Sequence, residues 1–125
     1  MTQQVHILVI DDDETFRAML VQMLMQDKHR VSSACDGEEG LRLAAEINPD
    51  LIITDILMPH RDGIEVIMAL NDAGSGIPVI AISGGRRAIS AEFNLQSAEL
   101  MGVTAMLKKP FVRADLRLAI ETALK

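Results

Sequence analysis

The chain has 125 residues, the length of one domain, and 49% of them are hydrophobic and 24% charged. This composition is typical of a globular protein and excludes a disordered or collagen-like chain. The 18 acidic residues outnumber the 12 basic ones and give a formal net charge of −6, so no direct nucleic-acid contact is expected.

Five short apolar runs follow one another along the chain, at residues 5–10, 30–35, 51–55, 78–83 and 103–107. They start about 20–27 residues apart, the length of one βα unit. Most are continuously apolar, as expected of parallel strands covered on both faces. The second run (RVSSAC) is the most polar and is expected at an edge of the sheet.

Helical periodicity fills the intervals between these runs. Apolar side chains recur at helical spacing within residues 16–24, 41–45 and 64–70. A fourth helix is expected to end at Gly102, and residues 112–124 are predicted to form a closing helix. The alternation predicts an α/β fold in which a (βα)5 unit forms a doubly wound, five-stranded parallel sheet.

Acids, a hydroxyl and a lysine stand at the carboxyl ends of four predicted strands, where ligands bind in such folds. They are Asp11, Asp12, Asp13, Asp55, Ser83 and Lys109. Crowded carboxylates raise one another's pKa and destabilise the fold unless a cation neutralises them, and Mg²⁺ suits such a site. A lysine and a hydroxyl can hold a tetrahedral oxyanion near Asp55. The sequence therefore predicts a metal-plus-phosphoryl site.

Four motifs in this order resemble the receiver domain of two-component response regulators, the chemotaxis-regulator-like family. They are ILVIDD, the run from Asp55 through Met58-Pro59 to Asp62-Gly63, Ser83-Gly84, and Lys109-Pro110-Phe111. Each motif is weak alone, but their common order and spacing are specific. The resemblance implies a flavodoxin-like receiver fold with strand order 2-1-3-4-5. Because the sequence ends with the closing helix, we expect a single receiver domain over residues 1–125 and no effector domain.

The resemblance also implies roles for the acidic residues. Asp55 would accept a phosphoryl group from a sensor histidine kinase, a histidine phosphotransfer protein or a small phosphodonor such as acetyl phosphate. Asp12 would bind Mg²⁺ directly and Asp11 through a water molecule. Asp55 and the backbone carbonyl of Leu57 would complete the protein ligands. Such a protein catalyses only its own phosphorylation and dephosphorylation, so no external substrate is expected.

On the same resemblance, Lys109 would pair with Asp55 at rest and with the phosphoryl oxygens afterwards. Ser83, followed by Gly84, takes the hydroxyl position of the family's switch, and the Lys109–Pro110 peptide is expected to be cis. Met106 stands where the family usually has Tyr or Phe. We therefore expect the Ser83 half of the switch without its aromatic half.

The family signals through the face of its fourth helix, fifth strand and closing helix. Leu100 and Leu118 are apolar residues expected on that face, which predicts a partner surface or a homodimer contact. The output could also be that of a phosphorelay intermediate or a non-phosphorylated scaffold. A rival interpretation comes from Asp11-x-Asp13-x-Thr15, which resembles the first motif of haloacid-dehalogenase-type phosphatases, with Asp11 as nucleophile.

The remaining features bear on localisation and on the histidines. No apolar segment reaches the roughly 20 residues that span a bilayer, so no membrane insertion is expected. The single cysteine, Cys35, excludes an internal disulfide and fits a reducing cytosol, so we expect a cytoplasmic protein. Asp13 is expected to cap a helix. His29 is expected at the surface.

Overall fold

Five parallel strands form one sheet in the computed structural model, which describes residues 4–56, 63–74, 76–83 and 103–124. Its order is β2-β1-β3-β4-β5, which confirms the predicted fold class. The strands are β1 (His6–Ile10), β2 (Arg30–Ala34), β3 (Leu51–Asp55), β4 (Val79–Ser83) and β5 (Ala105–Lys108). The polar second run forms an edge strand, as its sequence predicts.

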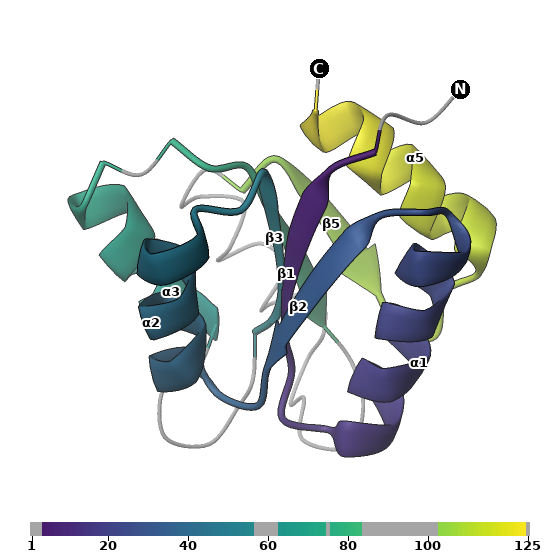
Figure 1. Cartoon of the computed structure of the whole chain (residues 1–125), viewed down its shortest axis with the longest axis horizontal. Coiled ribbons are helices and arrows are strands. Elements are labelled where there is room, and N and C mark those ends of the chain that lie inside the picture. Colours follow the sequence, from purple (N-terminus) through teal and green to yellow (C-terminus); the bar gives the residue numbers. More distant parts are fainter. Residues whose placement is uncertain (1–3, 57–62, 75, 84–102, 125) are drawn as a thin grey trace.

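Helices cover both faces of this sheet. The helices α1 (Glu14–Gln26) and α5 (Arg113–Ala123) lie on one face, and α2 (Gly37–Ile47) and α3 (Gly63–Asp72) on the other (Figure 1). The helix predicted to end at Gly102 lies outside the described residues. No helix of the described ranges combines the length and the apolar character that a membrane crossing requires.

Two aspartates cap helices that begin soon after strands end. The carboxylate of Asp13 accepts a hydrogen bond from the backbone N–H of Phe16 at the start of α1. Asp36 does the same for Glu39 at the start of α2. At Gly40, a Cβ atom would lie 2.4 Å from Cδ1 of Ile10, so a glycine lets α2 approach the end of β1 closely.

The two layers of the core follow from the apolar runs. All five residues of β3 are buried, as expected of a central strand covered on both faces. His29 contradicts its prediction, because only 5% of it is exposed. It is buried because its Nδ1 accepts a hydrogen bond from the backbone N–H of Val5 (3.2 Å), which anchors the segment before β1.

Candidate functional site

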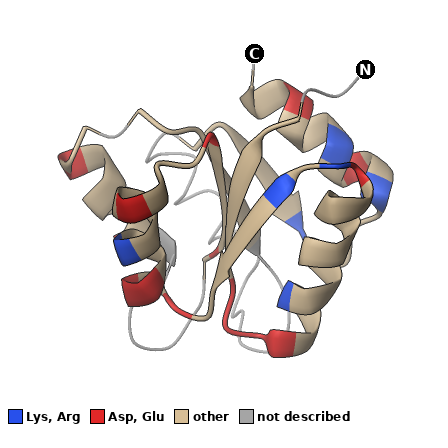
Figure 2. Ribbon diagram, in the orientation of Figure 1, with Lys and Arg blue, Asp and Glu red and all other residues tan. Residues whose placement is uncertain are grey.

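Three carboxylates meet at the carboxyl edge of the sheet. Asp11 follows β1 directly and Asp55 ends β3, and the pairing of Ile10 with Thr54 sets these neighbouring strands in register. One carboxylate oxygen from each of Asp11, Asp12 and Asp55 lies within 4.8 Å of the others. Figure 2 shows the acidic segment after β1 running into the start of α1.

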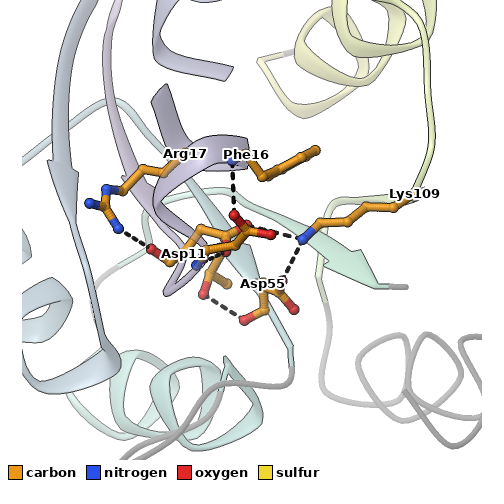
Figure 3. Close-up of polar contacts among 7 residues, drawn as sticks. Asp11, Phe16, Arg17, Asp55 and Lys109 are labelled. Atoms are coloured by element: carbon orange, nitrogen blue, oxygen red, sulfur yellow. Dashed lines mark hydrogen bonds and ion pairs between the residues drawn. The ribbon is translucent and has the colours of Figure 1, made fainter. Parts of the chain in front are cut away.

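Lys109 brings a positive charge into this acidic cluster. Its Nζ lies 2.9 Å from Oδ2 of Asp55 and 3.3 Å from Oδ2 of Asp11 (Figure 3). Burial of the ammonium works to lower the pKa of Lys109, but the hydrogen bond and charge of Asp55, with Asp11, outweigh it and raise that pKa. Lys109 is therefore firmly protonated, and its single ammonium faces a cluster of three carboxyl groups.

Burial makes this charge imbalance strong. Asp11 is 1% exposed, Asp55 is 5% exposed and the side chain of Lys109 is 14% exposed. Oδ1 of Asp11 accepts a hydrogen bond from the backbone N–H of Asp13 at 2.8 Å. Its buried Oδ2 accepts no hydrogen bond within the part of the chain that the structure describes, although Lys109 lies close. Like charges at this depth are costly without a further cation.

The donor set fits a small, hard cation. Three carboxylates offer oxygen atoms within reach of one another, and Mg²⁺ is bound by one or two carboxylates together with waters and phosphate oxygens. Oδ2 of Asp11 is buried and accepts no hydrogen bond among the described residues, and a metal ion would give such an oxygen atom a partner.

Two residues that the sequence analysis did not assign to the site, Arg17 and Phe16, support it. The guanidinium of Arg17 donates a hydrogen bond from Nη1 to the backbone carbonyl of Asp11 at 2.7 Å. The ring of Phe16 lies under the ammonium of Lys109, with 4.0 Å between Nζ and the ring centroid. The helical spacing marked Phe16 only as a core position, because periodicity assigns a residue to a face and not to a partner.

The other expected site residues have these positions. Ser83 ends β4, where it pairs with Lys108 of β5, and the peptide between Lys109 and Pro110 is cis. Met106 on β5 and Leu118 on α5 are 37% and 64% exposed. Three expected residues, Leu57, Gly84 and Leu100, lie outside the described residues, and so does the side chain of Ser83.

Comparison with known proteins gives concordant results. Residues 7–121 match the family described as the response regulator receiver domain. The transcriptional regulatory protein PrrA of Mycobacterium leprae is 36% identical over 119 residues, which are 95% of this chain and 49% of that protein. The response regulator MprA of Mycolicibacterium vanbaalenii is 35% identical over 90% of this chain and 47% of its own length. The chain thus spans about half the length of these curated relatives.

Solved structures show the same similarity. The chemotaxis protein CheY4 of Vibrio cholerae superposes with a TM-score of 0.85 at 27% identity, covering 98% of this chain and all (100%) of that one. The N-terminal domain of an uncharacterized protein from Wolinella succinogenes gives a TM-score of 0.83 at 36% identity, over 94% and 91% of the two chains. The chain therefore belongs to the response regulator receiver domain family of two-component systems.

Proposed function

We propose that this receiver domain accepts a phosphoryl group on Asp55 and signals its phosphorylation state to a partner protein. One observation carries the proposal. Asp55 ends a central strand in a buried acidic cluster, 2.9 Å from an ammonium group that the same acids hold charged. This arrangement supports a nucleophilic carboxylate beside a fixed positive charge, which phosphoryl transfer requires.

The proposed chemistry is a single displacement at phosphorus. A carboxylate oxygen of Asp55 forms the new P–O bond while the bond from phosphorus to the donor breaks. The donor's electron pair leaves with the imidazole of a phosphohistidine or with acetate from acetyl phosphate. The ammonium of Lys109 can then donate hydrogen bonds to the phosphoryl oxygens, where negative charge accumulates.

The acidic cluster would hold the metal that such a transfer uses. Asp11, Asp12 and Asp55 are the described residues that would bind Mg²⁺, and the backbone carbonyl of Leu57 is a further ligand expected from the family pattern. When bound, Mg²⁺ neutralises negative charge on the phosphoryl oxygens. The residues of this chain orient the acceptor oxygen of Asp55 and supply the second positive charge from Lys109.

The signal would pass from the phosphoryl group to the surface of β5 and α5. Phosphorylation can shift a conformational equilibrium only through contacts that differ between the two states, here those of Lys109 and Ser83. A pocket between β5 and α5, lined among others by Met106, Phe111 and Leu118, supports a partner or homodimer contact on that face. A cytoplasmic histidine kinase or histidine phosphotransfer protein would be the phosphodonor.

Intact mass spectrometry tests this proposal. The wild-type protein is incubated with acetyl phosphate and Mg²⁺, beside the variant Asp55→Asn under the same conditions. We expect the wild type to gain about 80 Da, the mass of one phosphoryl group, and the variant to gain nothing. An unmodified wild type, with acetyl phosphate and with a cognate kinase, would contradict the proposal and leave a receiver-shaped scaffold.

The same experiment distinguishes phosphorylation of Asp55 from the phosphatase interpretation, in which Asp11 is the nucleophile. A gain that persists in Asp55→Asn and disappears in Asp11→Asn would make Asp11 the nucleophile. The position of Asp13 weighs against that outcome. Its carboxylate accepts a hydrogen bond from the backbone N–H of Phe16 at 3.1 Å as the cap of α1, whereas the phosphatase interpretation needs it as a general acid.

A further inference from the structure

The phenyl ring of Phe16 forms one wall around the ammonium of Lys109. Its centroid lies 4.0 Å from Nζ, well inside the roughly 6 Å over which a cation is attracted to an aromatic face. Figure 3 shows the two side chains approaching from α1 and from the segment after β5. Among the residues that the structure describes, the charged and aromatic neighbours of the ammonium are thus Asp55 at 2.9 Å, Asp11 at 3.3 Å and this ring.

Both the backbone and a second ring fix the position of Phe16. Its backbone N–H binds the cap residue Asp13, so the ring is placed by the same turn that carries the acidic segment. The ring also meets Phe111 in an edge-to-face contact with 5.8 Å between centroids and 81° between planes. Phe111 lies two residues after Lys109, so α1 is tied to this segment at two points.

We infer that Phe16 is a positioning residue whose aromatic face holds the Lys109 ammonium beside Asp55 and Asp11. A lysine ammonium sits on a flexible four-carbon stem and has three N–H donors. A third carboxylate in place of the ring would occupy one of those donors. The ring attracts the charge without accepting a conventional hydrogen bond, so donors stay available for phosphoryl oxygens.

This inference rests on the proposed phosphoryl transfer for its consequence but not for its geometry. Phe16 also packs against the hydrophobic core, so removal of its volume alone would disturb the protein. The electrostatic role must therefore be separated from the packing role. Fluorination of the ring makes this separation, because it withdraws charge from the aromatic face while nearly preserving its shape.

The experiment places mono-, di- and trifluorophenylalanine at position 16 of the full chain and measures the initial rate of phosphorylation by acetyl phosphate. We expect a graded loss that reaches about 2- to 30-fold, the rate equivalent of one cation–π contact. Phe16→Leu should show at least this loss. Phe16→Tyr keeps an aromatic ring at this position and should phosphorylate at the wild-type rate. The same fluorinated residues at Phe111 are the comparison and should give a smaller loss than at Phe16, because the ring of Phe111 contacts Phe16 edge to face whereas the ring of Phe16 itself faces the ammonium.

A second measurement needs neither phosphate nor metal. Protons held over an aromatic face resonate upfield, so the CεH₂ signals of Lys109 should be displaced in the NMR spectrum of the wild type and return to ordinary positions in Phe16→Leu. An ordinary position in the wild type, or equal phosphorylation rates across the fluorinated series, would overturn the inference. A wild type that shows the upfield signals but gains no phosphoryl group would instead contradict the proposed function.

Discussion

Two clusters of this molecule bring acidic and basic side chains together. Acidic groups are in excess in the first, and basic groups in the second. At the carboxyl edge of the sheet, one ammonium, that of Lys109, lies against the carboxylates of Asp11 and Asp55. Between α1 and α5, one carboxylate, that of Asp27, lies against two guanidinium groups. Arg117 donates to it at 2.7 and 3.1 Å, and Arg113 contacts the same carboxylate.

The basic side chains of the two clusters differ in burial, whereas the side chains of Asp27 and Asp55 are equally buried, each 6% exposed. The side chain of Lys109 is 14% exposed, whereas those of Arg113 and Arg117 are 41% and 49% exposed. Hydrogen bonds from Arg117 and then from Arg113 hold the pKa of Asp27 far below its ordinary value of 3.8. The carboxylate of Asp27 is hydrogen-bonded by both guanidinium groups and fixes α1 to α5, although the buried Nε of Arg113 has no hydrogen-bond partner among the described residues. The strand-end cluster keeps buried negative charge, the condition that favours binding of a cation and a phosphoryl group.

The largest expected effect is the loss of the buried ammonium. Lys109→Met leaves Asp11 and Asp55 buried without this neighbouring positive charge. Without Mg²⁺, the free energy of unfolding should fall by about 3–5 kcal/mol, as for other broken buried ion pairs. Urea denaturation in a chelating buffer at pH 7 measures this change. A loss below about 1 kcal/mol would mean that the acids are relieved in another way.

Removal of the acid from the other cluster should also destabilise the protein. Asp27→Asn weakens charge-assisted hydrogen bonds to Arg113 and Arg117, and the free energy of unfolding should fall by about 1–3 kcal/mol. Asp72→Asn is the matched control, because Asp72 is an exposed acid at the end of α3. Thermal unfolding at pH 7 should give a lower melting temperature for Asp27→Asn than for Asp72→Asn. Equal melting temperatures would show that Asp27 does not stabilise the fold.

Removal of an acid at the strand ends should raise the free energy of unfolding, whereas removal of Asp27 should lower it. Asp12→Asn reduces repulsion among the three crowded carboxylates, so the free energy of unfolding without Mg²⁺ should rise by about 1 kcal/mol. The gain should shrink when Mg²⁺ is added, because the variant has lost a ligand. If Asp12→Asn destabilised the metal-free protein as Asp27→Asn does, the two clusters would not differ in charge balance.

The smallest effect concerns pH and His29, a neighbour of Asp27 along the chain. Burial lowers the pKa of His29 below 6.5, and the charge of Asp27 opposes this only in part. The unfolded chain therefore binds a proton at His29 more readily, so stability is lost as the pH falls below 6.5. The loss should approach about 1 kcal/mol, the worth of the Val5–His29 hydrogen bond.

His29→Asn provides the control for this pH dependence. An asparagine can accept the hydrogen bond from Val5 but does not titrate. Melting temperatures of wild type and variant between about pH 7.5 and about pH 5.5, one unit either side of the ordinary histidine pKa, should diverge as the pH falls. Parallel curves would show that another group controls the stability in this range.

The sequence predicted the fold and the place of the site because both depend on local patterns. Continuous apolar runs at βα spacing indicate parallel strands, and residues after those runs reach one edge of the sheet. Asp11, Asp55 and Lys109 could therefore be grouped without coordinates. Their roles in binding Mg²⁺ and phosphate stay predictions, since they rest on the family pattern.

The contacts between helices could not be predicted in this way. Asp27 lies 86 and 90 residues from Arg113 and Arg117, and no periodicity relates them. For Phe16, the helical spacing predicted only the face of α1 on which the ring lies. Its contacts with Lys109 and Phe111 depend on how α1 packs against the segment after β5, and the spacing does not predict that packing. His29 was wrongly expected at the surface, since its burial depends on the distant N–H of Val5.

The charge imbalance at the strand ends is tested most directly by a Mg²⁺ titration followed by thermal unfolding. Mg²⁺ should raise the melting temperature of the wild type and of Asp27→Asn alike, because it binds the folded acidic cluster and not the unfolded chain. The rise should be absent in Asp12→Ala. A wild-type melting temperature that does not change with Mg²⁺, or an equal rise in Asp12→Ala, would contradict a cation site at Asp11, Asp12 and Asp55.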